Sequence, residues 1–166
     1  MFRTIEDFLH TWIDETEATL KIFGALTDAS LEQRVGSQGR TLGRIGWHIV
    51  QTLPEMGGRM GLNITGPQEE EAVPISAEQI LAAFRGSAES LAAEIRDHWG
   101  DGDLEVEDDM YGEAWPRGRT LAILVAHQVH HRGQMTVLMR QAGLPVPGVY
   151  GPSREEWAGY GMPAQE

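Results

Sequence analysis

The residues of this chain that are best suited to carry out chemistry are its histidines. Three of the six fall within the five residues 127–131, which read HQVHH. If this segment is helical, His127 and His131 lie one turn apart on the same face. The same face carries apolar residues on both sides of the pair, Leu124, Met135 and Leu138. We therefore predict an inward-facing histidine pair that can bind one metal ion without distorting its helix.

A third histidine is predicted to face the same interior. His48 lies between Ile45 and Ile49 in a second helical pattern, and a buried polar ring needs a partner because leaving it unpaired is costly. Three neutral imidazoles with further positions left to water are typical of a catalytic or exchangeable metal site. Imidazole alone does not select the metal, so zinc, nickel, iron and manganese all remain candidates.

Each histidine also has a simpler interpretation. His127 and His131 fit a hydrogen-bonded core pair, and His48 taken alone fits a core histidine with its hydrogen bonds satisfied. Viewed down the helix, His130 lies to one side of His127 and His131 lies to the other side. We therefore expect His130 to be a flanking, interface or outer-sphere residue. The remaining two, His10 and His98, are expected to lie at helix ends or on exposed faces.

The spacing of His127 and His131 also matches the zinc-binding helix of metallopeptidases, H-E-x-x-H. The second position here is Gln128, and an amide cannot serve as the general base that deprotonates a zinc-bound water. The sequence therefore argues against a metallopeptidase of this type, although the geometry of the metal site can be similar. The sequence also contains no nucleophile-elbow, phosphate-loop or dinucleotide-binding motif.

Four helical patterns are predicted to position these histidines. They span about Thr4–Phe23, Thr41–Gly61, Ser76–Trp99 and Arg119–Ala142. Each carries apolar residues at three- and four-residue spacing, which predicts an all-α fold, a four-helix bundle. Evidence for strands is weak, and we interpret Asn63–Pro74 and Asp101–Pro116 as solvated loops.

We expect a single domain over residues 1–166 that ends in an irregular tail, 146–166, rich in glycine and proline. In the tail, Trp157 and Tyr160 are candidates to hold the segment against the bundle. Trp47, beside His48, and Trp115, just before the last helix, are candidates to line the mouth of a pocket.

Composition restricts the partners. The 166 residues include 25 acidic and 13 basic side chains, for a net charge of −12, which argues against nucleic acid and against anionic membranes as partners. No apolar run reaches the roughly 18 residues of a membrane span, and the N-terminus lacks the apolar core of a signal peptide. We therefore expect a cytoplasmic protein that acts on a small molecule.

One motif is specific enough to suggest a family. The run His127–Gln134, HQVHHRGQ, followed by Leu138, Arg140, Gly143 and Pro145, resembles the last helix of the DinB/YfiT-like, damage-inducible family. Helix order, chain length and the position of His48 within Gly46–Ile49 extend the resemblance over nearly the whole chain.

The resemblance implies a four-helix bundle, often a homodimer. It also implies a metal bound by one histidine of the second helix and two of the fourth, which match His48, His127 and His131. The matching Arg132, Gly133 and Gln134 are expected to support the helix. Relatives in this family include bacillithiol and mycothiol transferases, in which the metal is thought to bind the sulfur of a low-molecular-weight thiol.

Three hypotheses follow. The first is a metal-dependent transferase that activates a low-molecular-weight thiol for attack on an electrophile. The second is a non-enzymatic, dimeric stress-response protein whose metal is structural. The third is a bundle in which the histidines only hydrogen-bond to one another. The chain has no cysteine, so in the first case the sulfur must arrive with a small molecule.

Overall fold

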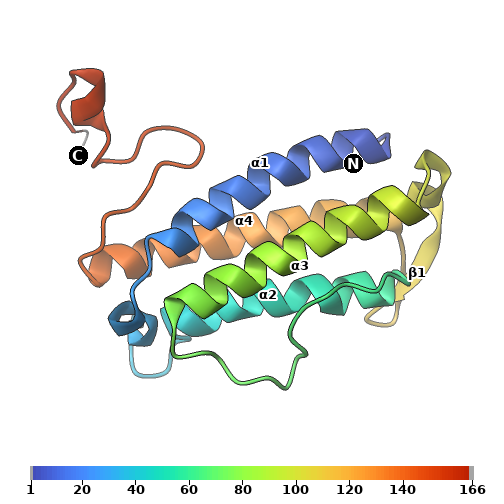
Figure 1. Ribbon diagram of the computed structural model, residues 1–166, viewed down its shortest axis with the longest axis horizontal. Helices are drawn as coiled ribbons and strands as arrows, with labels where there is room; N and C mark the ends of the chain where they lie inside the picture. The colour runs from blue at the N-terminus through green and yellow to red at the C-terminus, as the bar shows by residue number, and fades with distance from the viewer. Residues whose placement is uncertain (1, 165–166) are drawn as a thin grey trace.

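Four long helices make up most of the structure, a computed structural model that describes residues 2–164 (Figure 1). The long helices are α1 (Ile5–Gly24), α2 (Leu42–Arg59), α3 (Ala77–His98) and α4 (Arg117–Gln141). Short 3-10 helices are η1 (Asp28–Glu32), η2 (Asp101–Glu105) and η3 (Trp157–Tyr160), and the strands are β1 (Glu107–Met110) and β2 (Glu113–Pro116). The predicted all-α bundle is confirmed, and each predicted helix end lies within two residues of the observed one.

Side-chain caps fix where the first three long helices begin. The Thr4 hydroxyl accepts a hydrogen bond from the Asp7 backbone N–H at 3.0 Å, and the Asp7 carboxylate accepts one from the Thr4 backbone N–H. The Thr41 hydroxyl accepts a hydrogen bond from the Arg44 backbone N–H at the start of α2, and the Ser76 hydroxyl accepts one from Gln79 at the start of α3, in both cases without the returning bond. These bonds satisfy N–H groups that the first helical turn leaves without partners.

The packing order explains why two particular helices carry the histidines. α1 packs against α3 and α4, and α2 packs against the same two helices, so α1 and α2 lie diagonally across the bundle. In Figure 1, α2 and α3 run in the same direction because the segment between them returns along the bundle. α2 and α4 are neighbours, and a site between their facing sides is possible.

The core is apolar and is dominated by large side chains of α1, α2 and α3. Phe8 and Trp12 stack at 5.7 Å between ring centroids, and the Trp12 indole N–H donates to the Ala88 carbonyl at 3.0 Å. Other fully buried side chains include Phe23, Leu42, Ile49, Leu53, Ile80, Phe84, Leu91 and Ile95. None of the helices within residues 2–164 is sufficiently long and apolar to cross a membrane.

The interpretation of Asp101–Pro116 as a solvated loop is wrong. This segment forms η2 and the antiparallel hairpin β1–β2, in which Glu107 pairs with Pro116 and Met110 with Glu113. Leu104 and Met110 are buried and attach the segment to the bundle. Most of its acids point outward, which gave it the appearance of a loop. The other connection, Asn63–Pro74, has no regular element, as predicted.

The C-terminal tail is held by other residues than those predicted. Tyr160 is two-thirds exposed, and Trp157 contacts the Tyr160 ring within η3. The tail is instead joined to the bundle by the Tyr150 hydroxyl, which donates to the Glu15 carboxylate of α1 at 2.8 Å. A second link is the ion pair between Arg140 of α4 and Glu155 at 2.6 Å. Of the predicted tail, residues 165–166 lie outside the described residues, as does residue 1 of the predicted domain.

Candidate metal centre

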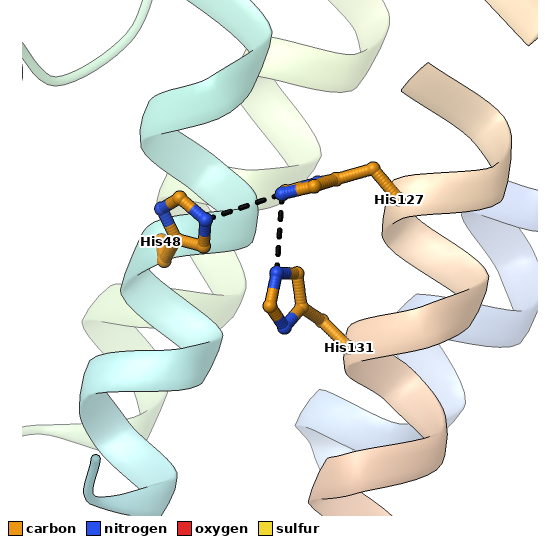
Figure 2. Close-up of side chains that lie close together, drawn as sticks. All are labelled: His48, His127 and His131. Atoms are coloured by element: carbon orange, nitrogen blue, oxygen red, sulfur yellow. Dashed lines mark hydrogen bonds between the residues drawn. The ribbon is translucent and has the colours of Figure 1, made fainter. Parts of the chain in front are cut away.

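The three predicted histidines meet between α2 and α4 (Figure 2). His48 comes from the middle of α2, and His127 and His131 come from consecutive turns of α4. His131 is buried, and the other two are half-buried. Within residues 2–164, these three form the one group of at least three histidine, aspartate or glutamate side chains that lie close enough to share an ion. We refer to them as the histidine triad.

The triad presents one nitrogen from each ring to a common point. The Nε2 atom of His127 lies 3.1 Å from Nε2 of His48 and 3.1 Å from Nε2 of His131. Ligand nitrogens bound at the usual 2.0–2.1 Å around a single ion are separated by about 3.0–3.4 Å, depending on its geometry. Both separations from His127 therefore fit a single divalent ion, and the three ligand atoms all lie within 4.8 Å of one another.

Hydrogen bonding alone does not satisfy this arrangement. A neutral imidazole carries one N–H proton, so Nε2 of His127 can donate to only one of its two neighbours. The Nδ1 atom of His131 lies 2.8 Å from the Gln134 side-chain oxygen, an acceptor. His131 therefore carries its proton on Nδ1 and offers a lone pair at Nε2. One metal ion can accept the lone pairs of all three Nε2 atoms at once, whereas one proton can form a hydrogen bond between only two of the rings.

The environment keeps the rings neutral, which metal binding requires. Burial lowers the pKa of His48 to about 4, and the charge that His131 would carry if protonated and the charge of Arg40 act in the same direction. Burial, together with the charge that a protonated His131 would carry, likewise lowers the pKa of His127 to about 4. The pKa of His131 is also lowered, again mainly by burial, while its hydrogen bond with Gln134 opposes the shift.

Gln134 and His130 lie just outside the triad. The Gln134 amide accepts from His131 and its nitrogen contacts Nε2 of His130 at 3.1 Å, so Gln134 bridges the two rings. Partners of this kind fix the tautomer and orientation of a ligating histidine. His130 is thereby an outer neighbour, as expected. His10 and His98 are both exposed, which confirms their interpretation as ordinary surface residues.

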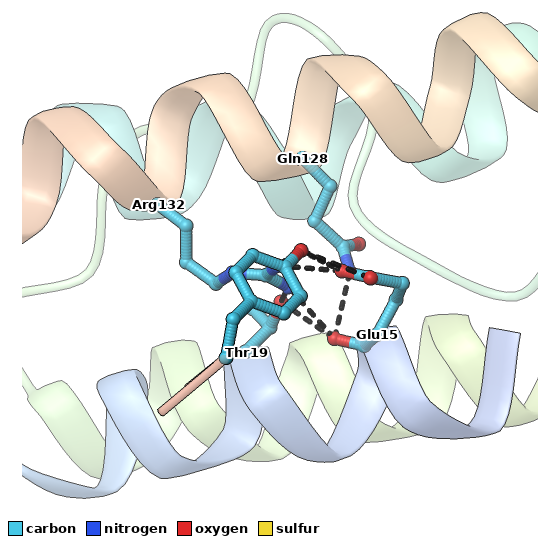
Figure 3. A network of polar contacts seen from close by, with 5 residues as sticks. Glu15, Thr19, Gln128 and Arg132 are labelled. Atoms are coloured by element: carbon cyan, nitrogen blue, oxygen red, sulfur yellow. Dashed lines mark hydrogen bonds and ion pairs between the residues drawn. The ribbon is translucent and has the colours of Figure 1, made fainter. Parts of the chain in front are cut away.

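The opposite face of α4 binds α1 through a buried polar network (Figure 3). Arg132, only 3% exposed, forms an ion pair with Glu15 at 2.5 Å and donates to the Thr19 hydroxyl at 3.0 Å. Gln128 donates to the Glu15 carbonyl at 3.0 Å. The residue at the peptidase base position therefore points away from the triad, and the predicted supporting role of Arg132 is confirmed.

Two hollows of similar size open beside the triad. The basic hollow, of about 440 Å³, reaches His48 and is lined by Arg40, Arg44, His48, Gln51, Thr52, Glu55, Arg59, Glu69 and Tyr111. The apolar hollow, of about 420 Å³, reaches His131 and is lined by Val35, Gly39, Arg40, Ile45, His131, Gln134, Val137 and Leu138. The triad is thus accessible to small molecules from two sides, and Arg40 borders both.

Trp47 lines a separate hollow of about 360 Å³, but neither of the predicted tryptophans lines the two hollows beside the triad. Trp47 is buried and its indole N–H donates to the Glu71 carbonyl at 3.1 Å, while Trp115 stacks against Arg119 and donates to Glu113. Tyr111, at the tip of the hairpin that the sequence analysis did not predict, is the aromatic residue that lines the basic hollow. The sequence did contain a signal for the α2 wall of the basic hollow. Four of its residues recur at helical spacing on one face of α2, namely Arg44, His48, Glu55 and Arg59.

Comparison with known proteins gives a consistent result. The model of the DinB family matches residues 1–166. The Bacillus subtilis (strain 168) protein YrdA, described only as uncharacterized, is 43% identical over 164 residues, which cover 99% of this chain and 98% of YrdA.

Two crystal structures have the same fold. A DinB-like protein from Bacillus cereus ATCC 10987 is 45% identical, with a TM-score of 0.87, and the match covers 90% of this chain and all of that one. The DinB-like protein YjoA from Bacillus subtilis is 13% identical, with a TM-score of 0.64 over 82% of this chain and 92% of its own, and shows similarity of fold alone.

Proposed function

This chain belongs to the DinB family, and from that premise we propose that it is a metal-dependent enzyme whose ion is bound by His48, His127 and His131. The observation that carries the proposal is the convergence of three Nε2 atoms, 3.1 Å apart in each contacting pair, with no fourth ligand among the described residues. Three imidazoles leave coordination positions for a substrate. Zinc, nickel, iron and manganese fit this donor set.

We further propose that the substrate is a low-molecular-weight thiol and that the reaction is its transfer to an electrophile. When bound, the ion would supply a Lewis acid that lowers the pKa of the thiol. The thiol loses its proton to solvent, a bond forms between its sulfur and an electrophilic carbon, and the leaving group departs with the electron pair of the broken bond. Since the chain has no cysteine, the reacting sulfur comes from outside.

The chain's own contribution is positioning. α2 and α4 hold the three rings, Gln134 fixes the tautomer of His131, and burial keeps the imidazoles unprotonated at neutral pH. The two adjoining hollows, of about 440 and 420 Å³, fall within the usual size of small-molecule sites, about 300–1,000 Å³. Their presence supports a site open to substrate.

Metal analysis of the purified protein is the first test. We expect a stoichiometric divalent ion in the wild type and its loss in His131→Ala and His127→Ala. His98→Ala, which removes an exposed histidine of α3, is the matched control and should keep the ion. Circular dichroism establishes that each variant is folded. Unchanged metal content in both triad variants would overturn the assignment of the site.

Activity is tested with the metal-loaded protein. Chlorodinitrobenzene serves as the electrophile and glutathione or cysteine as the thiol, with the rate of thioether formation as the readout. We expect catalysis by the wild type and by His98→Ala, and none by His131→Ala. Metal binding without acceleration of any thiol transfer would favour the non-enzymatic, structural-metal alternative.

The family resemblance also leads us to propose a homodimer, and the sequence leads us to propose that it is located in the cytoplasm. Light scattering coupled to size-exclusion chromatography tests the first point, since a dimer has twice the 18.4 kDa mass of the chain. Fractionation of cells of the source organism tests the second.

A further inference from the structure

We infer that Arg40 and Arg44 form an anion subsite in the basic hollow, which takes a carboxylate of the small molecule bound at the histidine triad. This inference deepens the proposed function and depends on it for the ligand at the metal, but the subsite itself can be tested without a thiol. The evidence lies in how the charges of the hollow are paired.

The floor of the basic hollow is one face of α2. Arg44, His48, Gln51 and Glu55 follow one another at intervals of three or four residues, so they line the hollow in a row. Arg44 is therefore one helical turn from a triad ligand. Arg40, just before the helix, borders both hollows, and its charge contributes to the electrostatic environment of all three histidines.

Glu55, an acid on the α2 face that forms the floor of the basic hollow, is already paired. The Glu55 carboxylate forms an ion pair with Arg59 at 2.5 Å and accepts a hydrogen bond from the Tyr111 hydroxyl at 2.8 Å. The Arg59 guanidinium also lies over the Tyr111 ring, 4.4 Å from its centroid. Glu55 and Arg59 therefore neutralise each other, and neither compensates the charge of Arg40 or Arg44.

Arg44 is oriented by a neutral group. Its guanidinium donates to the Gln51 side-chain oxygen at 3.1 Å, and the Gln51 amide nitrogen donates to the carbonyls of Gln68 and Glu69 at 2.7 and 3.0 Å. Across residues 2–164, neither Arg40 nor Arg44 forms an ion pair with a carboxylate. A protein with a net charge of −12 thus directs two uncompensated positive charges at its candidate metal centre.

Adding a divalent ion to the triad makes this charge imbalance larger. The ion and the two arginines would border the same hollow, so their like charges would repel, and an anion bound between them would relieve the repulsion. A carboxylate fits, because a guanidinium can donate two parallel hydrogen bonds to it. Glu69, at the rim toward a neighbouring hollow, is the remaining acid of the wall, and its charge should weaken anion binding.

The test uses cobalt(II)-loaded protein and two thiols of similar size, 3-mercaptopropionate and 2-mercaptoethanol. Binding of each is followed by the sulfur-to-cobalt charge-transfer absorbance. We expect the wild type to bind the carboxylate-bearing thiol at least about tenfold more tightly, as for a hydrogen-bonded charged pair. The Arg40→Gln/Arg44→Gln variant should lose this preference, so that the ratio of its affinities for the two thiols falls to about one. Glu69→Gln should increase the preference, and added salt should reduce it.

A thiol-free arm separates this inference from the proposed function. Succinate, titrated calorimetrically into the metal-loaded protein, should bind the wild type and Arg44→Lys, which keeps the charge, but not the double glutamine variant. Metal content and melting temperature establish that the variants are intact. Equal affinity for the two thiols, or equal succinate binding by the wild type and the double variant, would overturn the subsite. Absence of charge transfer with either thiol would overturn the thiol proposal, and the succinate result would then decide the subsite alone.

Discussion

At the scale of single residues, the triad shows how sequence spacing becomes a site. The four-residue interval between His127 and His131 predicts that both rings project from one face of a helix, and His48 was placed on the inward side of its own pattern. Their convergence followed from these two facts together with the packing of α2 on α4. The surrounding arginines were not predicted, because overall charge hides a local cluster and Arg40 lies outside the helix.

Gln134 provides the first prediction. Its side-chain oxygen accepts from Nδ1 of His131 and so keeps Nε2 of that ring available to the ion. Removing such an outer partner typically weakens metal binding about 10- to 100-fold. We expect this loss in Gln134→Ala, measured by competition with a chromophoric chelator. Gln141→Ala, on the same helix but distant from the triad, is the control. Equal affinities for the two variants would contradict a positioning role for Gln134.

Tyr111 provides a prediction about pH. Partial desolvation of the half-exposed ring and the hydrogen bond to Glu55 raise the pKa of Tyr111 from 10.0 to about 12. The folded state therefore holds the phenol proton more tightly than the unfolded chain does. The resulting stabilisation is complete below pH 10 and is lost as the pH rises toward 12.

Ultraviolet absorbance of tyrosinate measures this titration, and the difference between the wild type and Tyr111→Phe isolates the one phenol. Glu55→Gln should shift the titration to lower pH, because it removes the negative charge beside the hydroxyl. Tyr160→Phe, at an exposed position, is the control. A Tyr111 phenol that titrates near pH 10 in the folded wild type would contradict the contact with Glu55.

At the scale of elements, the helices were predictable and the hairpin was not. Helix periodicity extends over about 20 residues and is reinforced by the caps at Thr4 and Ser76. The strands have four residues each, and β1 reads Glu107-Asp108-Asp109-Met110, with one buried side chain at its end. So short a pattern carries little information. The turn adds to the difficulty, because Tyr111 has a positive φ of 63°, a conformation uncommon outside glycine.

Close packing of α2 supplies a prediction at this scale. A Cβ atom added at Gly57 would lie 2.4 Å from Cγ1 of the buried Ile64, whereas one added at Gly58 meets nothing within 4 Å. We expect Gly57→Ala to destabilise the fold by about 1–3 kcal/mol through overpacking. Gly58→Ala should instead stabilise it by about 0.5–1 kcal/mol, because alanine favours the helix.

Chemical denaturation of the two variants measures the difference in unfolding free energy. The neighbouring positions share one helix and one substitution, so propensity is matched and packing alone differs. If both variants were stabilised to the same extent, the connection that follows α2 would not be packed against Gly57 as described.

At the scale of the whole molecule, charge and architecture have separate roles. The net charge of −12 is carried mainly by outward-facing acids, while the basic hollow concentrates arginine beside the triad. Composition therefore predicts which classes of partner are disfavoured, but it does not predict the local charge at the site. The tail is a similar case, since Trp157 and Tyr160 are the residues that the sequence suggests as anchors, whereas Tyr150 is the residue that reaches Glu15. That residues 1–166 form one domain stays a prediction.

The last prediction concerns metal removal and separates the two leading hypotheses. The largest fully buried aromatic side chains, Trp12, Phe8, Phe23 and Phe84, come from α1 and α3, whereas the ion would join α2 to α4. The core therefore does not depend on the ion. Ligand binding to the folded state alone raises stability by about 4 kcal/mol when free metal is 1,000 times its dissociation constant.

We accordingly expect chelation to leave the helical circular dichroism signal unchanged, to lower the melting temperature, and to be reversed by added zinc. His131→Ala, already unable to bind, should show no response to the chelator. Loss of helical structure on chelation would mean that the ion holds the bundle together, as structural metals do in small domains that are unfolded without them. That outcome would favour the non-enzymatic hypothesis, because an ion required for folding is poorly suited to exchange ligands during turnover.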